Sequence, residues 1–233
     1  MGPGEWFGAL VNKPVKLLGG PGTIIVDGPK YGGEWIPHIG FILATGADGS
    51  TICSFTFKGG YIRDTGNVFS LAIHSRWVDK VTFTGNTIIN CGQCISNNGG
   101  DNWVITHNTI KGSFLNSDGQ RNLVGIFLVP AQYPNIGNLI AFNSIEAESE
   151  QPLIGIKLMT SSLYESRNNV VVANKIRLLG PLTKGIWVKP PNDGLPGVFY
   201  ENVIALNDLR GCATPLDISP ELLEVNTVWK NLI

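Results

Sequence analysis

Three short segments of similar sequence carry chemically distinct side chains at the same position, thirty residues apart. Phe127 lies in Gly-Ile-Phe-Leu, Lys157 in Gly-Ile-Lys-Leu and Trp187 in Gly-Ile-Trp-Val. Apolar residues flank the variable position on both sides, an alternation typical of a strand with one buried face. The three side chains are therefore expected to face outward together. Aromatic rings can stack on sugar rings, and a lysine between them can pair with a carboxylate.

The composition limits the kind of protein that carries these residues. The chain has 233 residues, of which 43% are hydrophobic, and a formal net charge of -1. Such a balance gives no electrostatic reason to bind nucleic acid or an anionic membrane. No apolar run approaches the ~18–20 residues of a membrane span, and no signal peptide is visible at the N-terminus. The 29 glycines indicate many turns rather than long helices.

A second pattern repeats along the chain: an apolar residue, two variable residues, Asn, one further residue and then Ile. The aligned asparagines, 22 to 35 residues apart, are Asn86, Asn108, Asn143, Asn174, Asn202 and Asn231. Phe55 takes the place of Asn in an earlier copy. A period of 20–50 residues indicates a solenoid, and β-branched runs such as Val170-Val171-Val172 favour strands. We therefore predict an all-β, single-stranded parallel β-helix of about seven coils that forms one domain over residues 1–233.

The asparagine that recurs in each copy of the repeat has a physical role in this fold. Two strands meet at a sharp bend, where Asn tolerates a left-handed backbone better than other residues except Gly. An inward amide can then bond to the Asn of the coil above and the coil below. The six aligned asparagines are thus predicted to form a structural ladder.

The repeat resembles the right-handed parallel β-helix proteins of the pectin-lyase-like superfamily, as does the opening segment KPVKLLGGPGTIIVDG, Lys13 to Gly28. The resemblance covers nearly the whole chain. It implies that the Gly-Ile-x-Leu strands form the first sheet, whose outer face carries the cleft in polysaccharide-cleaving members. It also implies a polysaccharide or oligosaccharide partner and an extracellular or cell-surface location. An enzyme of this kind would be a polysaccharide lyase or a glycoside hydrolase.

The resemblance places the candidate site on the outer face of the first sheet. Acidic glycans are among the ligands expected there. The predicted substrate-binding residues are Phe127, Lys157, Trp187 and Lys189. The weaker candidates for catalysis are His74, Arg76, Lys157, Lys189 and Asp217. In the strand alignment His74 shares a row with Lys189, whereas Ala72 shares one with Lys157. A capping or ion-pairing role is the competing interpretation for Arg76.

Two further groups of residues could bind a metal or carry thiol chemistry. Calcium-dependent uronate lyases of this superfamily carry acidic residues near the site, so Glu148 and Glu150 are weak candidates for a Ca²⁺ site. A solvated loop is the alternative, and no other cofactor is required. Cys91 and Cys94 form a Cys-x-x-Cys, which is found in redox pairs and zinc sites. No second ligand pair accompanies them, which favours small apolar residues in a turn.

The two ends of a solenoid must be covered, because an open coil exposes unpaired backbone groups. Residues 1–12 are apolar enough to form an N-terminal cap, and nothing equivalent is visible after the last repeat. The sequence thus predicts a homo-oligomer or a chain cut from a longer protein. The alternative function follows from the same idea: a non-catalytic structural or adhesin-type β-helix, with its aromatic face as a subunit interface.

Overall fold

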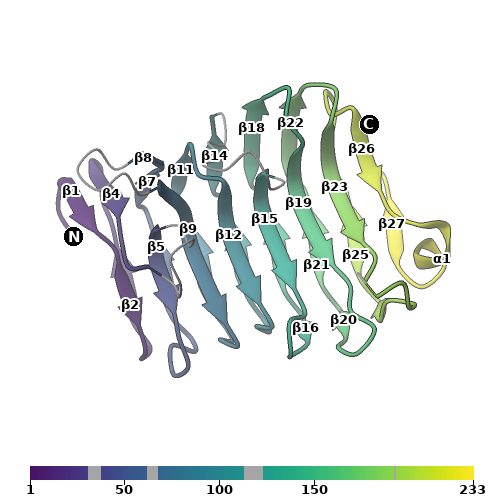
Figure 1. Ribbon diagram of the computed structural model, residues 1–233, viewed down its shortest axis with the longest axis horizontal. Helices are drawn as coiled ribbons and strands as arrows, with labels where there is room; N and C mark the ends of the chain where they lie inside the picture. The colour runs from purple at the N-terminus through teal and green to yellow at the C-terminus, as the bar shows by residue number, and fades with distance from the viewer. Residues whose placement is uncertain (31–37, 62–67, 113–122, 192) are drawn as a thin grey trace.

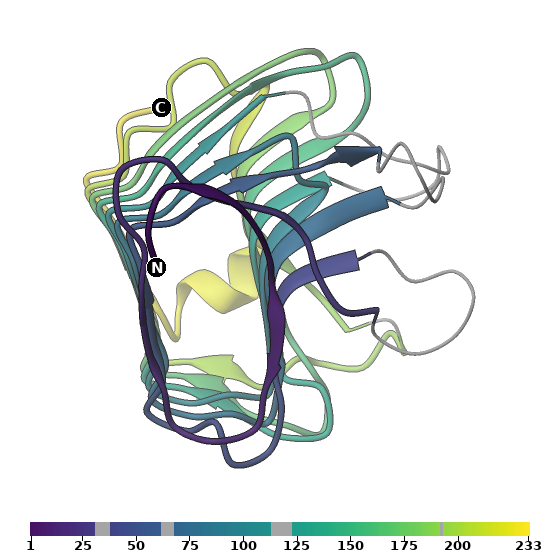
Figure 2. The same ribbon diagram turned by 90° about the vertical axis from the view of Figure 1, so that its left-hand side faces the viewer.

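The computed structural model describes residues 1–30, 38–61, 68–112, 123–191 and 193–233. Three parallel sheets wrap around a common apolar interior, as the side view and the end view show (Figures 1 and 2). The prediction of an all-β parallel β-helix is confirmed. Six coils contribute a strand to each of the three sheets, with partial turns beyond them, which is slightly fewer than the seven coils expected.

The three sheets differ in strand length and in number of strands. The seven-stranded sheet contains β1 (Gly4–Phe7), β4 (Thr23–Asp27), β7 (Thr56–Lys58), β11 (Thr87–Ile89), β14 (Thr109–Lys111), β18 (Ser144–Glu148) and β22 (Lys175–Leu179). The eight-stranded sheet contains β3 (Lys16–Leu18), β6 (Thr51–Cys53), β10 (Thr82–Thr84), β13 (Val104–Thr106), β17 (Leu139–Ala141), β21 (Val170–Val172), β25 (Val203–Ala205) and β27 (Thr227–Trp229). The nine-stranded sheet contains β2 (Ala9–Val11), β5 (His38–Leu43), β9 (Val68–Arg76), β12 (Gln93–Asn98), β15 (Leu123–Val129), β19 (Leu153–Met159), β23 (Thr183–Lys189) and β26 (Thr214–Asp217), with β8 (Gly60–Tyr61) antiparallel to β9. A small fourth sheet contains β16 (Asn135–Ile136), β20 (Ser166–Arg167) and β24 (Phe199–Tyr200).

The repeated apolar residues stack on one another because the strands are in register. In the eight-stranded sheet the central residue of each strand pairs with its equivalent in the next coil, and these are Phe83, Ile105, Ile140, Val171 and Ile204. All of them are buried in one core that runs through the stack. Burial of each such side chain stabilises the fold by roughly 1.5–3 kcal/mol. The apolar period in the sequence is thus the register of the coils.

The predicted Asn ladder is present at the corner between the eight-stranded and seven-stranded sheets. Its side-chain bonds, with Nδ2 donating to the next Oδ1 at 2.9–3.1 Å, connect Asn86, Asn108, Asn143, Asn174, Asn207 and Asn231. Each Oδ1 also accepts the backbone N–H of the preceding rung. Phe55 occupies the position before Asn86 and donates its N–H to the Asn86 Oδ1, as the alignment expects.

One assignment within the ladder is wrong. Asn202 belongs to a second ladder at the other end of the eight-stranded sheet, and Asn207 takes its place in the first. The second ladder connects Asn138, Asn169, Asn202 and Asn226, each bonded to the next at 2.9 Å. The misassignment arises because Asn202 and Asn207 lie five residues apart, and apolar residues flank both at the spacing of the repeat.

The ends of the solenoid also differ from expectation. Residues 4–7 and 9–11 extend two sheets as β1 and β2, paired with β4 and β5, rather than lying across the first coil. At the opposite end a short helix, α1 (Pro220–Leu223), crosses the interior of the last coil (Figure 2), and Leu222 packs against the core. The C-terminal end therefore has a small cap that the sequence did not reveal. Among the described residues, no helix is long and apolar enough to cross a membrane.

Candidate functional site

The nine-stranded sheet aligns the candidate residues in one outward-facing row. Consecutive register partners along this row are Ile42, His74, Ser96, Phe127, Lys157, Trp187 and Asp217. Their neighbours along each strand, such as Ile126 and Leu128, lie in the core. Phe127 and Trp187 are therefore two strands apart, about 10 Å at the usual strand spacing, and Lys157 lies between them.

Lys157 is held between the two aromatic rings. Its Nζ lies 4.9 Å from the Phe127 ring centroid and 5.0 Å from the Trp187 ring centroid. A second lysine, Lys184, lies 4.0 Å from the Trp187 ring and forms a 2.5 Å ion pair with Asp217. A cation over an aromatic face gains about 0.5–2 kcal/mol, with the larger values where water is excluded. We call this group of Phe127, Lys157, Trp187 and Lys184 the lysine–aromatic row.

The charge of Lys157 is less favourable than that of an ordinary lysine. Only 9% of the residue is exposed. Burial and, to a smaller extent, the nearby cations Lys189 and Lys184 together lower the pKa of Lys157 to about 8. A group placed beside like charges and away from water gains most when an anion approaches. The geometry is thus suited to an acidic ligand.

The expected placement of His74 is wrong by two residues. His74 pairs with Ile42 and Ser96, in the row of Lys157, whereas Arg76 shares a row with Asn98. Ala72 is fully buried and belongs to the core.

The error is one of register. The alignment matched Ser70-Leu71-Ala72-Ile73 to the Gly-Ile-x-Leu segments, whereas Ala72-Ile73-His74-Ser75 is in register with them. Ala72 is therefore level with the glycines that begin these segments, where side chains point inward: at Gly155 a Cβ would lie 2.6 Å from the Ile176 Cγ2. His74 lies on the outer face as expected, one row from its expected position.

His74 and Arg76 have different environments. His74 is buried, and burial together with the Arg76 charge lowers the pKa of His74 to about 4. His74 is consequently neutral at pH 7 and cannot pair electrostatically with an acidic sugar. Arg76 is exposed at the end of β9. The catalytic roles considered for both residues stay predictions.

Carboxylates are scarce on this face. Asp217 is the one carboxylate in the described strands β12, β15, β19, β23 and β26, and Lys184 already binds it. Hydrolysis with inversion uses two carboxyl groups ~6.5–9.5 Å apart, and retention uses two at ~5–5.5 Å. The described strands of the face supply one such group, Asp217.

The acidic segment before β19 comprises the end of β18, an inner strand of the seven-stranded sheet, and the residues that follow it. Glu146 pairs with Lys175 at 3.9 Å, and Glu148 and Glu150 are exposed. Among the described residues there is no group of three or more His, Cys, Asp or Glu side chains placed to hold a metal ion. The Ca²⁺ site at Glu148 and Glu150 stays an untested prediction.

Cys91 and Cys94 are free thiols in the core. Burial raises the pKa of Cys91 to about 12 and that of Cys94 well above its usual value. Since the thiolate is the reactive form, these buried thiols are unreactive at neutral pH. The interpretation of this pair as small apolar residues fits the structure.

A pocket of about 410 Å³ continues the face beyond Lys189. It is lined by Thr160, Pro190, Leu195, Glu221 and Leu222, among others. Thr160 follows Met159, the register partner of Lys189, and its N–H and hydroxyl both donate to the Lys189 carbonyl oxygen at 3.0 and 3.1 Å. The C-terminal end of the face is therefore walled rather than flat.

The sequence analysis did not identify Lys184 as a site residue, although it directly precedes the Gly-Ile-Trp-Val segment. Thr-Lys-Gly-Ile-Trp-Val-Lys, residues 183–189, contains a lysine on each side of the Gly-Ile-Trp-Val pattern. The bend at Gly185 places Lys184 on the same face as Trp187, which strict alternation from Ile186 would not. A Lys two or three positions before an outward aromatic residue was the available signal.

The similarity searches add little to the site. No known protein family matches the sequence, and no curated protein does. Among solved structures, a catalytic domain of a GH87 α-1,3-glucanase in complex with nigerose matches at 10% identity and a TM-score of 0.37, with 99% of this chain and 63% of that chain covered. The surface protein and adhesin PfbA of Streptococcus pneumoniae matches at 9% identity and a TM-score of 0.37, with coverage of 99% and 87%. The chain spans less than two thirds of the glucanase domain, and similarity this low carries over no activity.

Proposed function

We propose that the protein binds an acidic polysaccharide or oligosaccharide on the outer face of the nine-stranded sheet. The observation that carries the proposal is the position of Lys157, which lies at 4.9 and 5.0 Å from two aromatic rings on neighbouring strands. The half-buried rings offer apolar surface for sugar rings. Lys157, Lys184 and Lys189 supply three positive charges around them.

Charge balance favours an acidic over a neutral glycan. Three lysines face one carboxylate, Asp217, and that carboxylate is already paired with Lys184. An incoming uronate carboxylate would offset the burial and the repulsion from Lys189 and Lys184 that together lower the pKa of Lys157. The protonated, ligand-bound form of Lys157 would be stabilised in proportion to that effect.

Binding without hydrolysis is the function that we favour, because the described strands β12, β15, β19, β23 and β26 carry a single carboxylate, Asp217, which Lys184 already binds. A lyase reaction, in which a base removes a proton next to a uronate carboxylate, would need a group such as Lys157 in its neutral form. A pKa of about 8 gives a minor neutral fraction at pH 7. Membership of the pectin-lyase-like superfamily and an extracellular location belong to this proposal, as does the Ca²⁺ dependence of such a reaction.

The alternative is that the lysine–aromatic row is an interface between subunits in a structural or adhesin-type protein. The alternation of lysines with rings disfavours it, because like charges would meet across a symmetric contact. Interfaces between copies of a chain normally exclude lysine from their centre.

A titration with defined oligosaccharides tests the proposal. Trigalacturonate should quench the intrinsic tryptophan fluorescence, and neutral maltotriose at the same concentration should not. Trp187→Ala and Lys157→Met should each weaken trigalacturonate binding by about tenfold or more, since stacking and a desolvated charge pair are each worth ~1–2 kcal/mol.

A second exposed Trp–Lys pair provides the matched control. Lys230 lies 4.4 Å from the Trp229 ring on the eight-stranded sheet, away from the candidate face. Trp229→Ala should leave the affinity unchanged. Equal weakening by Trp229→Ala and Trp187→Ala, or wild-type affinity in both Trp187→Ala and Lys157→Met, would place the glycan elsewhere.

A further inference from the structure

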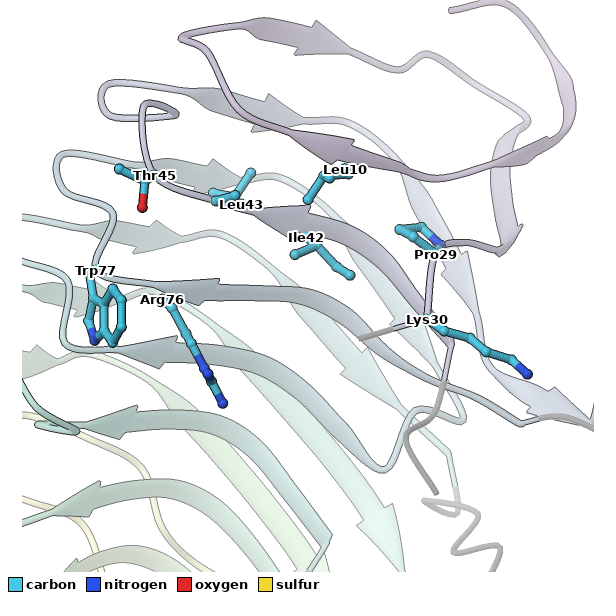
Figure 3. A pocket seen from close by; sticks show the side chains of 9 residues that line it. Leu10, Pro29, Lys30, Ile42, Leu43, Thr45, Arg76 and Trp77 are labelled. Carbon is cyan, nitrogen blue, oxygen red and sulfur yellow. The ribbon is translucent and has the colours of Figure 1, made fainter. Parts of the chain in front are cut away.

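A second concave site lies on the same sheet, near its N-terminal end. A pocket of about 410 Å³ opens between β2, β5 and the end of β9 (Figure 3). Leu10 and Ile42 lie at its middle, Trp77 and Thr45 at one end, and Pro29 and Lys30 at the other. Ligand pockets in proteins typically measure ~300–1,000 Å³ and are mostly apolar, with a few polar groups that fix orientation. This pocket has the size and the composition of a small-molecule site.

The aromatic wall of the pocket is fixed in an unusual conformation. Trp77 has a φ of 58°, in the left-handed region that a bulky residue rarely adopts. Its indole N–H donates to the Ala131 carbonyl oxygen at 3.1 Å, and its ring packs on Tyr133 with centroids 5.1 Å apart. Gly99 makes room for this pair, since a Cβ there would lie 2.9 Å from the Tyr133 Cβ. The same conformation recurs at other bulky corner residues, such as Phe142 and Leu206, so at Trp77 it sets the direction of the indole.

The charges of the pocket are all of one sign. Arg76 and Lys30 line it, and the described lining contains no carboxylate. Arg76 is exposed at the end of β9 and carries five N–H donors in a fixed fork. The guanidinium plane matches a carboxylate in a two-point contact. The pocket is therefore complementary to an anion.

The rest of the lining argues against a sugar as the occupant. Among the described lining residues Thr45 supplies the one side-chain hydroxyl, whereas Leu10, Ile42, Leu43 and Ala44 are apolar. A sugar ring buried there would lose hydrogen bonds to water that these side chains cannot replace. A flat apolar body would instead bury surface against the leucines, the isoleucine and the indole.

We infer that this pocket binds an aryl carboxylate, with the aromatic body between Leu10, Ile42 and Trp77 and the carboxylate on Arg76. This site is separate from the lysine–aromatic row. Ile42 and Phe127 lie in the same outward row, three strands apart, or roughly 14 Å at the usual strand spacing. One face of the solenoid thus holds two sites of different selectivity.

Calorimetry with a charged ligand and its neutral isostere tests this inference. 4-Hydroxycinnamate should bind the full chain, whereas 4-hydroxycinnamamide, which has the same ring without the charge, should bind at least about tenfold more weakly. Arg76→Gln should reduce the affinity for the acid to that for the amide. Trp77→Gly, which keeps the left-handed backbone at no steric cost, should weaken both ligands.

Two further variants separate binding from folding. Leu10→Trp changes an exposed side chain and should fill the pocket, so binding should be lost while the melting temperature stays within a few degrees. Trp187→Ala should leave 4-hydroxycinnamate binding unchanged, which distinguishes this site from the glycan site. Equal affinity for the acid and the amide, wild-type affinity in Arg76→Gln, or no detectable binding at millimolar concentration would each overturn the inference.

Discussion

Two rows of side chains run along the solenoid, one inside and one outside. The buried polar groups of the inner row are fully hydrogen-bonded, whereas the buried lysine of the outer row lies beside aromatic rings and other cations. In the inner row, each central amide bonds above, below and to the backbone: Asn174 donates to Asn207 Oδ1 at 2.9 Å and to the Ile140 carbonyl oxygen at 2.9 Å. In the outer row, Lys157 is almost as buried but lies against rings and near other lysines.

The difference separates a structural row from the row that we propose binds a ligand. A buried polar group that is fully hydrogen-bonded has nothing left to offer a ligand. A charge that is desolvated and surrounded by like charges stores unfavourable energy that an anion can release. Both rows repeat with the coil, so periodicity alone cannot tell them apart, and the state of their hydrogen bonds and charges can.

The largest effect is expected from breaking the inner row. Asn174→Ala removes the acceptor for the Asn143 backbone N–H and Nδ2 at 3.0 and 2.9 Å, and it removes the donor to Ile140 and Val172. Each buried group left without a partner costs ~1–3 kcal/mol, so the variant should lose about 3 kcal/mol of unfolding free energy. Equilibrium denaturation in urea measures this loss.

Two comparisons make that test specific. Asn12→Ala changes an exposed asparagine outside the ladders and should alter the unfolding free energy by less than ~0.5 kcal/mol. Asn202→Ala and Asn207→Ala should both cost as much as a ladder rung, because each belongs to one of the two ladders. A wild-type unfolding curve for Asn207→Ala would contradict the assignment of that residue to the first ladder.

The second expected effect sharpens the contrast through pH. The pKa of Lys157 is about 8 when folded and ~10.4 when unfolded. Between these values the unfolded chain binds more protons than the folded chain, so this residue makes stability rise with pH. Below about pH 8 both states are protonated and its contribution is constant. The rise should amount to roughly 1–3 kcal/mol between pH 8 and pH 10.4.

Lys157→Met isolates this contribution. Other groups also titrate in the same range, including Cys91, whose raised pKa makes stability fall as pH rises. The difference in unfolding free energy between the wild type and Lys157→Met cancels those groups. That difference should favour the variant at pH 7 and shrink steadily above pH 8. A difference that stays constant from pH 7 to pH 10 would show that Lys157 titrates normally.

The fold could be predicted because the same types of inward-facing residue recur once in each coil. The apolar positions stack by register, and five of the six asparagines assigned to the ladder belong to it. The error at Asn202 has a local cause: the corner before the eight-stranded sheet also carries asparagine, so the last four coils read Asn-x-x-x-x-Asn at 138–143, 169–174, 202–207 and 226–231. That second motif was available in the sequence.

The site could be predicted only in part because its outward positions repeat with the coil but the residue types at those positions do not. The thirty-residue spacing of Phe127, Lys157 and Trp187 predicted neighbours on adjacent strands, and they are register partners. The position of Lys184 depends on the bend at Gly185, and the row of His74 depends on the register of β9 with its neighbours. Neither the burial of Lys157 nor the lowered pKa follows from residue types, since both depend on packing between coils.

The smallest expected effect comes from Lys184. Its ion pair with Asp217 is partly exposed, with side-chain exposures of 32% and 38%. Exposed pairs contribute ~0–1 kcal/mol, so Lys184→Gln should barely change the unfolding free energy at pH 7. Its effect should appear on Lys157 instead, because Lys184 is one of the two cations that lower the Lys157 pKa after burial has done so. Titration of the lysine side-chain carbons by NMR should show the Lys157 pKa moving upward in Lys184→Gln. Arg210→Gln breaks the Arg210–Asp208 pair at 2.8 Å, which lies outside the row, and should leave the Lys157 pKa unchanged. An identical Lys157 pKa in Lys184→Gln and the wild type would mean that burial alone sets the charge of the outer row.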